Sequence, residues 1–496
     1  MWETTGGLGM SKHRLGIGVW LVLVMSTSVA LFGADGKTSS QGDASRLKPA
    51  YRFERNKWIY VHLEGSPADI GYQHGYLLAP EIADGLATVK FRDTRRTKRD
   101  WEFFRQTAEN VIWPKVDAEY QQELRGIADG LKARGVQMDL WDVVALNAME
   151  EVPDYYVPWL DRQQKRADAP RLTAPGNCSA FVATGSMTKD HKPVIAHSNW
   201  TDFPTGTRWT IIFDIVPTHG YHIIQDGFPG IIVSDDDFGI NSSGLMVTET
   251  TITGFSLFDP NGKPEFARAR KALQYASSID EYVKIMLDGN NGGYANDWLL
   301  ADNKTGEVAR FELGLKIHRV WRTKDGYFVG SNFPSDPKLI KDETNFDPTN
   351  MGSSMNARHV RWDELMDQNK GQIDIAMAQK FLADHWDSYQ KKEDPNERTL
   401  CGHTNLSPRG VPEWDDAPYS PGGAVTSQAA DSSMAKNMTF AARAGFPCGA
   451  DFLAEPFLKE HPEFDWEKPV LRDMKGNPWA EFQAGEKPAG AVAGGK

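Results

Sequence analysis

The chain contains few cysteines, no long run of charge of one sign and, after its N-terminus, no long apolar run. Its 496 residues include three cysteines, Cys178, Cys401 and Cys448, too few for a fold that depends on many disulfides. The net charge of −12 is spread along the chain, which argues against nucleic-acid binding through a basic surface. The 40% hydrophobic content suffices for a large core in one elaborate domain or in two or three ordinary ones.

The one long apolar run lies near the N-terminus. Basic residues 12–14 precede 18 mostly apolar residues from Leu15 to Phe32, and the small residues Gly33 and Ala34 follow. This order predicts a secretory signal peptide over residues 1–34 and a secreted or periplasmic protein. An uncleaved anchor is the alternative, because 18 residues are just long enough to span a bilayer. The polar tract over 35–56 is predicted to be a flexible linker.

The remaining chain changes character at Cys178. Residues 57–177 are predicted to form one strand at 57–63 and then helices over about 67–110, 116–131 and 140–150, followed by an exposed loop at 158–177. Residues 178–484 are richer in strand-like runs, including 209–216, 221–225, 230–234 and 245–252. The Gly/Ala/Pro-rich tail at 485–496 is predicted to be disordered. The loop is the most natural place for the chain to be cut.

Cys178 is the strongest candidate for a reactive residue. An apolar β-type run begins at this cysteine, and a second such run contains His197, so two antiparallel strands would bring both residues to one sheet edge. His197 could activate the thiol in an intact chain. Alternatively, a cut between Asn177 and Cys178 would free an α-amine, which titrates near pH 8 and suits proton transfer. The strand position after a polar loop favours the second mechanism, although a simply buried thiol remains an alternative.

The motifs around these residues resemble two related enzyme families. Cys-Ser-Ala at 178–180, followed by Ala-His-Ser-Asn-Trp at 196–200, resembles the phospholipase B-like family, as do residues 228–230, 235–238 and 244–251. Residues 65–75 and 123–131 resemble the acyl-coenzyme A:6-aminopenicillanate acyltransferase (peptidase C45) family. Both belong to the N-terminal-nucleophile (Ntn) hydrolases. The resemblance extends over about residues 57–460.

The resemblance implies an α+β fold, a four-layer αββα sandwich, and autocleavage between Asn177 and Cys178. It implies that the cut N-terminal fragment stays bound. It also implies that Cys178 takes an acyl group as a thioester from an amide or ester, with a small-molecule or lipid substrate. A lipid substrate would bring peripheral contact with a membrane. Carried over by motif, the further site residues are His197, Trp200, Thr250 or Thr251, and an oxyanion-hole asparagine that is Asn332 or, slightly preferred, Asn356.

Several other polar residues have two interpretations. Asn199 is either a pocket donor or a turn cap, and Asp202 is either a pocket residue or a solvated turn residue. Asp236 lies in an acidic cluster that could bind a cation or, as preferred here, form a loop near the pocket mouth. Cys401 and Cys448 are predicted to form a disulfide, with three free thiols as the alternative. No cofactor or metal is predicted, because His359 and His403 lack the spacing to carboxylates or thiols that zinc ligands show.

Two other functions stay open at this point. One is a binding protein that keeps the Ntn fold without activity. The other is an intact cysteine protease with Cys178 and His197 as a catalytic dyad. The protease predicts activity in an uncut chain, whereas the Ntn enzyme requires the free α-amine of Cys178.

Overall fold

The computed structural model describes residues 44–166, 178–234 and 238–493. The chain divides into two compact units, 1–42 and 43–496, and the first lies outside the described residues. The predicted signal peptide, residues 35–43 of the predicted linker, Asn177 and Asp236 lie outside the described residues. Within the described part of the chain, every helix is too short or too polar to cross a bilayer.

The larger of two main sheets has ten strands. Their spatial order is β11 (His318–Thr323), β10 (Glu307–Leu313), β9 (Asn296–Asp302), β8 (Leu245–Thr251), β7 (Phe238–Asn241), β6 (Ile223–Gly227), β5 (Ile211–Pro217), β2 (Trp58–Gly65), β1 (Tyr51–Arg55) and β18 (Val492–Ala493). All neighbours are antiparallel except β2 and β5, which are parallel. This parallel pair joins the part of the chain before Cys178 to the part after it.

The smaller main sheet carries Cys178. Its order is β12 (Gly326–Gly330), β3 (Cys178–Thr184), β4 (Val194–Asp202), β15 (Gly422–Asp431), β16 (Thr439–Ala444) and β17 (Ala480–Gln483). In the antiparallel β3–β4 pair, Cys178 lies opposite Asn199 and Ala180 lies opposite His197. These four residues therefore share one face of the sheet. A separate two-stranded ribbon consists of β13 (Trp386–Asp387) and β14 (Lys392–Glu393).

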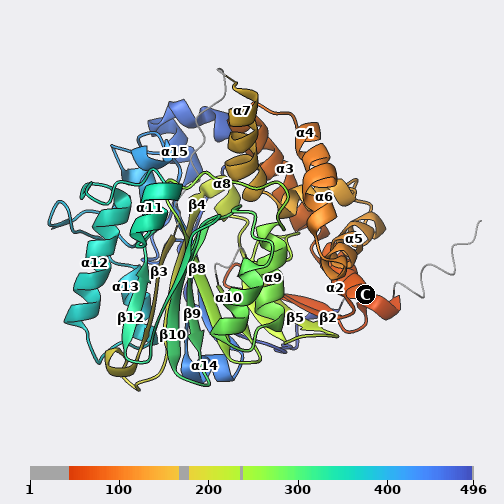
Figure 1. Ribbon diagram of the computed structural model, residues 1–496. Coiled ribbons are helices and arrows are strands. Elements are labelled where there is room, and N and C mark those ends of the chain that lie inside the picture. The colour runs from red at the N-terminus through yellow and green to blue at the C-terminus, as the bar shows by residue number, and fades with distance from the viewer. Residues whose placement is uncertain (1–43, 167–177, 235–237, 494–496) are drawn as a thin grey trace, which may run out of the picture. The chain divides into compact units, whose positions relative to one another are not determined.

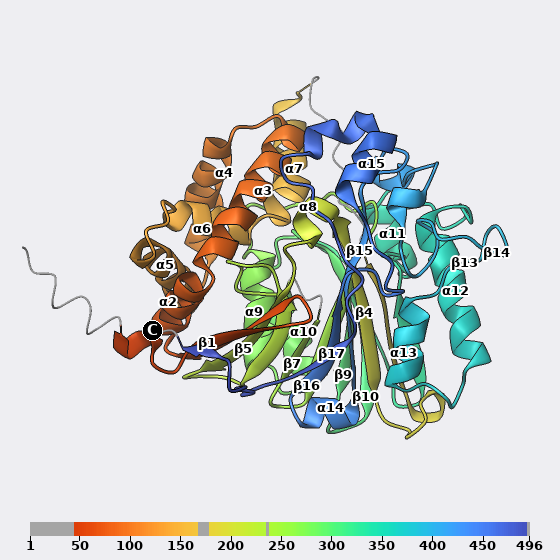
Figure 2. The same cartoon turned by 180° about the vertical axis from the view of Figure 1, so that it is seen from behind.

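The two main sheets pack face to face between outer layers of helices (Figures 1 and 2). Apolar side chains from both sheets, including Val182, Ile195 and Leu299, form the core between them. Helices α12 (Ser354–Gln368) and α13 (Ile375–Leu382) cover the smaller sheet. The larger sheet is covered by α2 (Pro67–Leu77), α3 (Ala79–Thr97), α5 (Ala118–Ala133), α6 (Leu140–Asn147), α9 (Glu265–Tyr275) and α10 (Ile279–Leu287). The expected α+β, four-layer αββα fold is confirmed.

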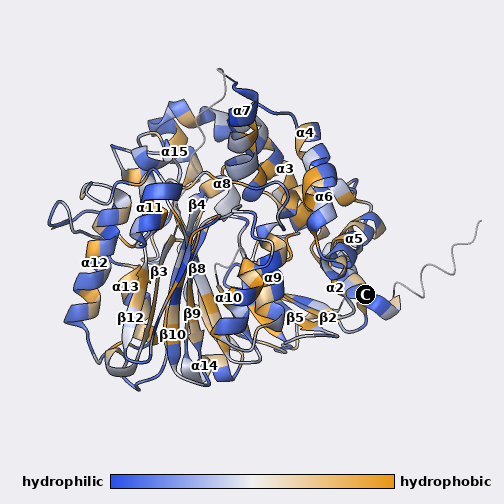
Figure 3. Ribbon diagram, in the orientation of Figure 1, coloured by the Kyte–Doolittle hydropathy of each residue, from blue (hydrophilic) through white to orange (hydrophobic). Residues whose placement is uncertain are grey.

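Shorter helices complete the described fold at its periphery. They are α4 (Trp101–Thr107), α7 (Val157–Gln164), α8 (Phe203–Gly206), α11 (Pro337–Glu343), α14 (Ser432–Lys436) and α15 (Ala454–Glu460). Figure 3 shows hydrophobic residues on the sheets and on the inner faces of the helices. Burying a large aliphatic side chain stabilises the fold by about 2 kcal/mol, so the packing of these layers stabilises both sheets.

Two helices that precede Cys178 interlock through glycines. In α2 and α5, a Cβ at Gly71 would lie 1.9 Å from the carbonyl oxygen of Glu123, and one at Gly126 would lie 2.4 Å from that of Ala68. Gly75 and Gly130 meet the facing backbone in the same way. The motifs at 65–75 and 123–131 thus encode close backbone packing of two helices.

Four of the predicted segments differ in the structure. Residues 51–55 form β1 and not flexible linker, because they pair with β2. Residues 157–164 form helix α7 and not the exposed loop expected there. Residues 230–234 form a turn and irregular backbone and not a strand, and Val492 in the predicted disordered tail pairs with Arg52. The C-terminal strand was missed because it pairs with a distant segment, whereas β1 forms a hairpin with the neighbouring β2 that was not predicted from the sequence.

Candidate active site

Cys178 begins β3 and is 2% exposed. Its backbone N–H donates to Oδ1 of Asn332 at 3.2 Å, and its thiol lies 3.6 Å from Oε1 of Glu249. His197 also lies close, since one side-chain atom from each of Cys178, His197 and Glu249 falls within 4.8 Å of the others. The structure therefore brings the two residues singled out by sequence together with a buried carboxyl group.

Asn332 follows β12 in a left-handed conformation with φ of 62°, which asparagine tolerates better than most residues. Its Nδ2 donates to the carbonyl oxygen of Thr251 at 2.9 Å. Its Oδ1 accepts from Cys178 and also from Nη2 of Arg358 at 2.8 Å. The amide is thus held from three sides with its oxygen towards the nitrogen of Cys178.

Arg358 is a fully buried cation beside Cys178. Its Nη1 donates to the carbonyl oxygen of Cys178 and to Oγ of Ser179, and its Nε donates to Oγ of Ser354. Its guanidinium carbon lies 4.4 Å from the ring centre of Trp200. Burial lowers the pKa of Arg358 to about 9, and interaction with Cys178 opposes this decrease. The group stays protonated at neutral pH and would stabilise a thiolate at Cys178.

His197 belongs to a buried chain of polar side chains. Its Nδ1 lies 3.3 Å from Oε1 of Gln428, whose Nε2 donates to Oδ2 of Asp226 at 2.8 Å. Ser234 donates to the other oxygen of Asp226 at 2.9 Å. Burial lowers the pKa of His197 to about 3 and raises that of Asp226 to about 8. His197 is therefore neutral at pH 7 and a poor acceptor for a thiol proton.

The two candidate oxyanion-hole asparagines lie in different surroundings. Nδ2 of Asn356, near the start of α12, donates to the carbonyl oxygens of Asp347 and Asn350 and to Oγ of Ser353. These bonds fix the turn before the helix, whereas Asn332 contacts Cys178. The order of preference from sequence therefore has to be reversed. The oxyanion role of either residue stays a prediction.

The other sequence-predicted site residues lie near Cys178 to different degrees. Asn199 lies opposite it in the neighbouring strand and is 4% exposed. Thr250 and Thr251 are buried at the end of β8, where the backbone of Thr251 binds Asn332. Asp202 caps α8 by accepting from the N–H of Thr205 at 2.8 Å, so its expected turn role is real.

A cavity of about 550 Å³ is lined by residues that follow Asn199 in β4, although Cys178 itself is not among its lining residues. Strand β4 runs past the start of β3, and its last residues, from Trp200 to Asp202, line this cavity together with Gly422 and Gly423 of β15. Its other walls are aromatic, acidic and basic, and include Phe91, Arg92, Arg96, Asp154, Trp414, Phe464, Trp466 and Glu467. The arrangement suits a substrate with an apolar part and polar groups.

Sequence reasoning missed three residues that contact the site. Glu249 lies inside the motif at 244–251, Arg358 lies two residues after Asn356, and Gln428 lies in β15. Only Glu249 carried a signal in the sequence, as a charged residue inside that motif. Each role depends on pairing between distant segments, which spacing along the chain does not reveal.

The predicted disulfide is wrong, since Cys401 and Cys448 are free thiols in the structure. Both nevertheless approach one imidazole, with Sγ–Nε2 distances to His403 of 3.3 and 3.6 Å. The expectation that His403 lacks nearby thiols is therefore also wrong. His359 instead stacks on Phe333, with ring centres 4.2 Å apart.

Comparison with known proteins agrees with these motifs. Residues 90–317 match the family model described as Phospholipase B. "Putative phospholipase B-like 1" of Caenorhabditis elegans is 22% identical over 88% of this chain and 86% of its own length. The chain is therefore similar to the phospholipase B-like family, by a family model that covers a little under half of it and by a relative that matches most of its length.

Other similar proteins match a smaller share of the chain. The "Acyl-coenzyme A:6-aminopenicillanic-acid-acyltransferase 40 kDa form" of Emericella nidulans is 25% identical over 49% of this chain and 60% of its own. An "Uncharacterized protein" of Archaeoglobus fulgidus is 25% identical over 49% of this chain and 41% of its own. A solved conjugated bile acid hydrolase from Clostridium perfringens covers 54% of this chain and 89% of its own at 12% identity, with a TM-score of 0.33.

Proposed function

We propose that this protein is an Ntn acyl hydrolase or acyltransferase that matures by cleavage between Asn177 and Cys178. One observation carries the proposal: the backbone nitrogen of Cys178, which cleavage would convert to an α-amine, is held by Oδ1 of Asn332 at 3.2 Å. The free amine would then belong to the same residue as the thiol that it must deprotonate. The role of Asn332 is to hold this amine.

Maturation begins before any α-amine exists. The thiol of Cys178 attacks the carbonyl carbon of Asn177, and the peptide C–N bond breaks to leave a thioester and the free amine. Water then hydrolyses the thioester and releases the carboxylate of Asn177. Glu249, 3.6 Å from the thiol, is the carboxylate placed to accept its proton in this first step.

Turnover then uses the new amine of Cys178. It takes the thiol proton, and the thiolate attacks the acyl carbon of an amide or ester. The resulting α-ammonium returns the proton to the departing amine or alcohol, leaving a thioester on Cys178. Water or a second amine attacks this thioester and releases the acyl group as an acid or a new amide. Arg358 stabilises the thiolate electrostatically.

The substrate enters through the cavity lined by Trp200 and Asp202. Aromatic walls accept an acyl chain, and charged residues such as Arg92 and Asp154 hold a polar head. These features support either a lipid ester or an N-acyl compound. The similar proteins include one named as a phospholipase B-like protein and one named as an acyltransferase.

Intact-mass analysis of the acyl-enzyme tests this function. The mature protein is mixed with a lysophospholipid or an N-acyl amide and quenched in acid within seconds. We expect the fragment that begins at Cys178 to gain the mass of one acyl group, and neutral hydroxylamine to remove it. Cys178→Ala is the control and should gain none. Equal labelling of the variant, or no labelling with either substrate class in cleaved protein, would contradict the assignment.

The intact-chain protease is the weaker alternative. It requires His197 to take and keep the proton of Cys178, but burial lowers the pKa of that imidazole to about 3. The α-amine avoids this difficulty because its ordinary pKa lies near 8.

A further inference from the structure

Four potential metal ligands converge away from Cys178. They are His385, after α13; Cys401 and His403, in the irregular segment before β15; and Cys448, after β16. One ligand atom from each lies within 4.8 Å of the others. Cys401 and His403 are buried, whereas His385 and Cys448 are partly exposed, so an ion could reach the cluster from one side.

The distances within this Cys401–Cys448–His385–His403 cluster fit a tetrahedral ion. In a zinc site with Zn–S near 2.3 Å and Zn–N near 2.0 Å, sulfur and nitrogen lie roughly 3.5 Å apart. Nε2 of His403 lies 3.3 Å from Sγ of Cys401 and 3.6 Å from Sγ of Cys448. Two thiolates would also cancel the charge of Zn²⁺, which a buried site favours.

The surrounding contacts are those of a supported site. The N–H of Ala450 donates to Sγ of Cys448 at 3.4 Å, and the ring of Phe446 lies 4.0 Å from that of His403, centre to centre. Backbone bonds also fix the segment, since the N–H of Cys401 donates to the carbonyl oxygen of Asp384 at 3.1 Å. The ligands are thus held by three separate pieces of chain.

We propose that His385, Cys401, His403 and Cys448 bind one Zn²⁺ as a structural site. Its effect would extend to the cavity wall, because Gly402 lies between two of the ligands and packs against Trp200. A Cβ at Gly402 would lie 2.3 Å from the Trp200 ring. Zinc would therefore fix the loop behind Trp200 without taking part in acyl transfer.

Metal analysis of the untagged full chain tests this site. Protein purified without chelator is dialysed against micromolar zinc sulfate, gel-filtered and analysed by mass spectrometry for metal. We expect one zinc per chain, and a near-complete loss in Cys401→Ser/Cys448→Ser. Cys178→Ala is the matched thiol control and should keep one zinc. It also disrupts the second Cys/His/Glu group, at Cys178, His197 and Glu249.

Spectroscopy on the unaltered protein guards against a variant that fails to fold. X-ray absorption should show two sulfur and two nitrogen ligands at about 2.3 and 2.0 Å. Chelation should lower the melting temperature of the wild type but not that of the double variant. Absence of retained zinc, equal zinc in the double variant, or a Cys401–Cys448 disulfide in a non-reducing peptide map of the isolated protein would each overturn the proposal.

Discussion

At the scale of single residues, three side chains each contact a different part of Cys178. Asn332 accepts a hydrogen bond from its backbone nitrogen, Arg358 donates one to its carbonyl oxygen, and Glu249 lies beside its thiol. Fixed dipoles and charges of this kind cost no reorganisation during a reaction. The same nitrogen serves as an amide before the cut and as the proposed base after it.

The two asparagines singled out by sequence provide a matched pair. We expect Asn332→Ala to lower kcat by about 10²-fold, because a group that holds a reacting atom is lost. Asn356→Ala should leave kcat within a few-fold and instead cost about 1–3 kcal/mol of stability, since the buried side-chain amide of Asn356 makes three hydrogen bonds that are lost. Steady-state kinetics and urea unfolding of both variants measure this. The reverse pattern would return the role to Asn356.

A buried ion pair predicts a pH dependence of stability. Burial alone would lower the pKa of His62, but Asp214 raises it overall, and despite burial His222 and His62 hold the pKa of Asp214 well below its usual range. The Asp214 contribution is present above its unfolded pKa and is lost as pH falls. The His62 contribution is present below its unfolded pKa near 6.5 and is lost as pH rises.

The free energy of unfolding should therefore decrease between about pH 6 and about pH 8.5. In His62→Gln this decrease should be smaller, because the variant has no imidazole to lose its proton. Urea unfolding of the two proteins at both pH values compares the slopes. Equal slopes would show that His62 does not carry this dependence.

At the scale of elements, local sequence patterns predicted some helices and strands, whereas others depend on contacts that only the fold reveals. Most helices and strands could be predicted, because periodicity and capping act locally; Ser66, for example, caps α2. Strand β1, helix α7 and the turn at 230–234 were not, although β1 forms a hairpin with the neighbouring β2. Cys178 and His197 were found for the same local reason. Arg358 and Glu249 were missed because only the fold brings them to Cys178.

The glycine contact between α2 and α5 gives an element-scale prediction. Gly126→Ala should destabilise the protein by about 3 kcal/mol, since a methyl group would meet backbone atoms of α2. Gly135→Ala, just after α5, has open space around it but a φ of 75°, and should cost only about 1 kcal/mol. Chemical denaturation of both variants gives the two values. Similar losses would mean that the helices shift to accept the methyl.

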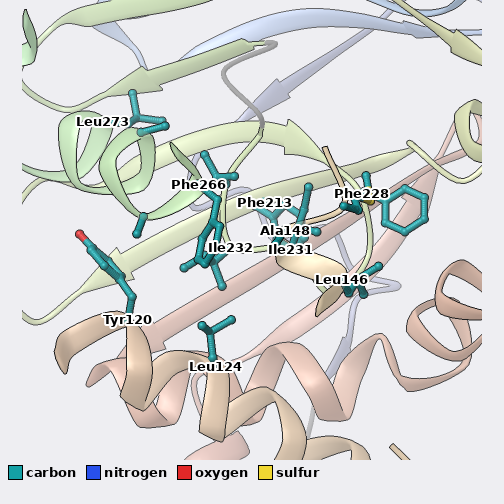
Figure 4. Packing of buried hydrophobic residues seen from close by; sticks show 14 of the residues in the cluster. Tyr120, Leu124, Leu146, Ala148, Phe213, Phe228, Ile231, Ile232, Phe266 and Leu273 are labelled. Atoms are coloured by element: carbon teal, nitrogen blue, oxygen red, sulfur yellow. The ribbon is translucent and has the colours of Figure 1, made fainter. Parts of the chain in front are cut away.

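At the scale of the whole molecule, the proposed cut divides one core. Leu124 and Leu146 precede Cys178 and pack in the same cluster as Phe213, Phe228 and Ile232, which follow it (Figure 4). Strand β2 also pairs with β5 across the cut over seven residue pairs. The two fragments therefore share a sheet and an apolar core.

Cleaved protein should accordingly behave as one particle. Gel filtration in native buffer should elute both fragments together at the size of the uncut Cys178→Ala protein. In about 6 M guanidinium chloride, which unfolds most domains, they should separate. Separate elution of the two fragments in native buffer would show that the shared core is too weak to hold them, and would contradict the expectation that they stay associated.

The most direct test of the central claim is the denatured mass of the purified full-length protein beside Cys178→Ala. We predict two fragments, one that ends at Asn177 and one that begins at Cys178, with the variant uncut. This result would show that the thiol of Cys178 creates its own α-amine. A single uncut chain in the wild type, with acyl-transfer activity retained, would contradict the N-terminal-nucleophile account.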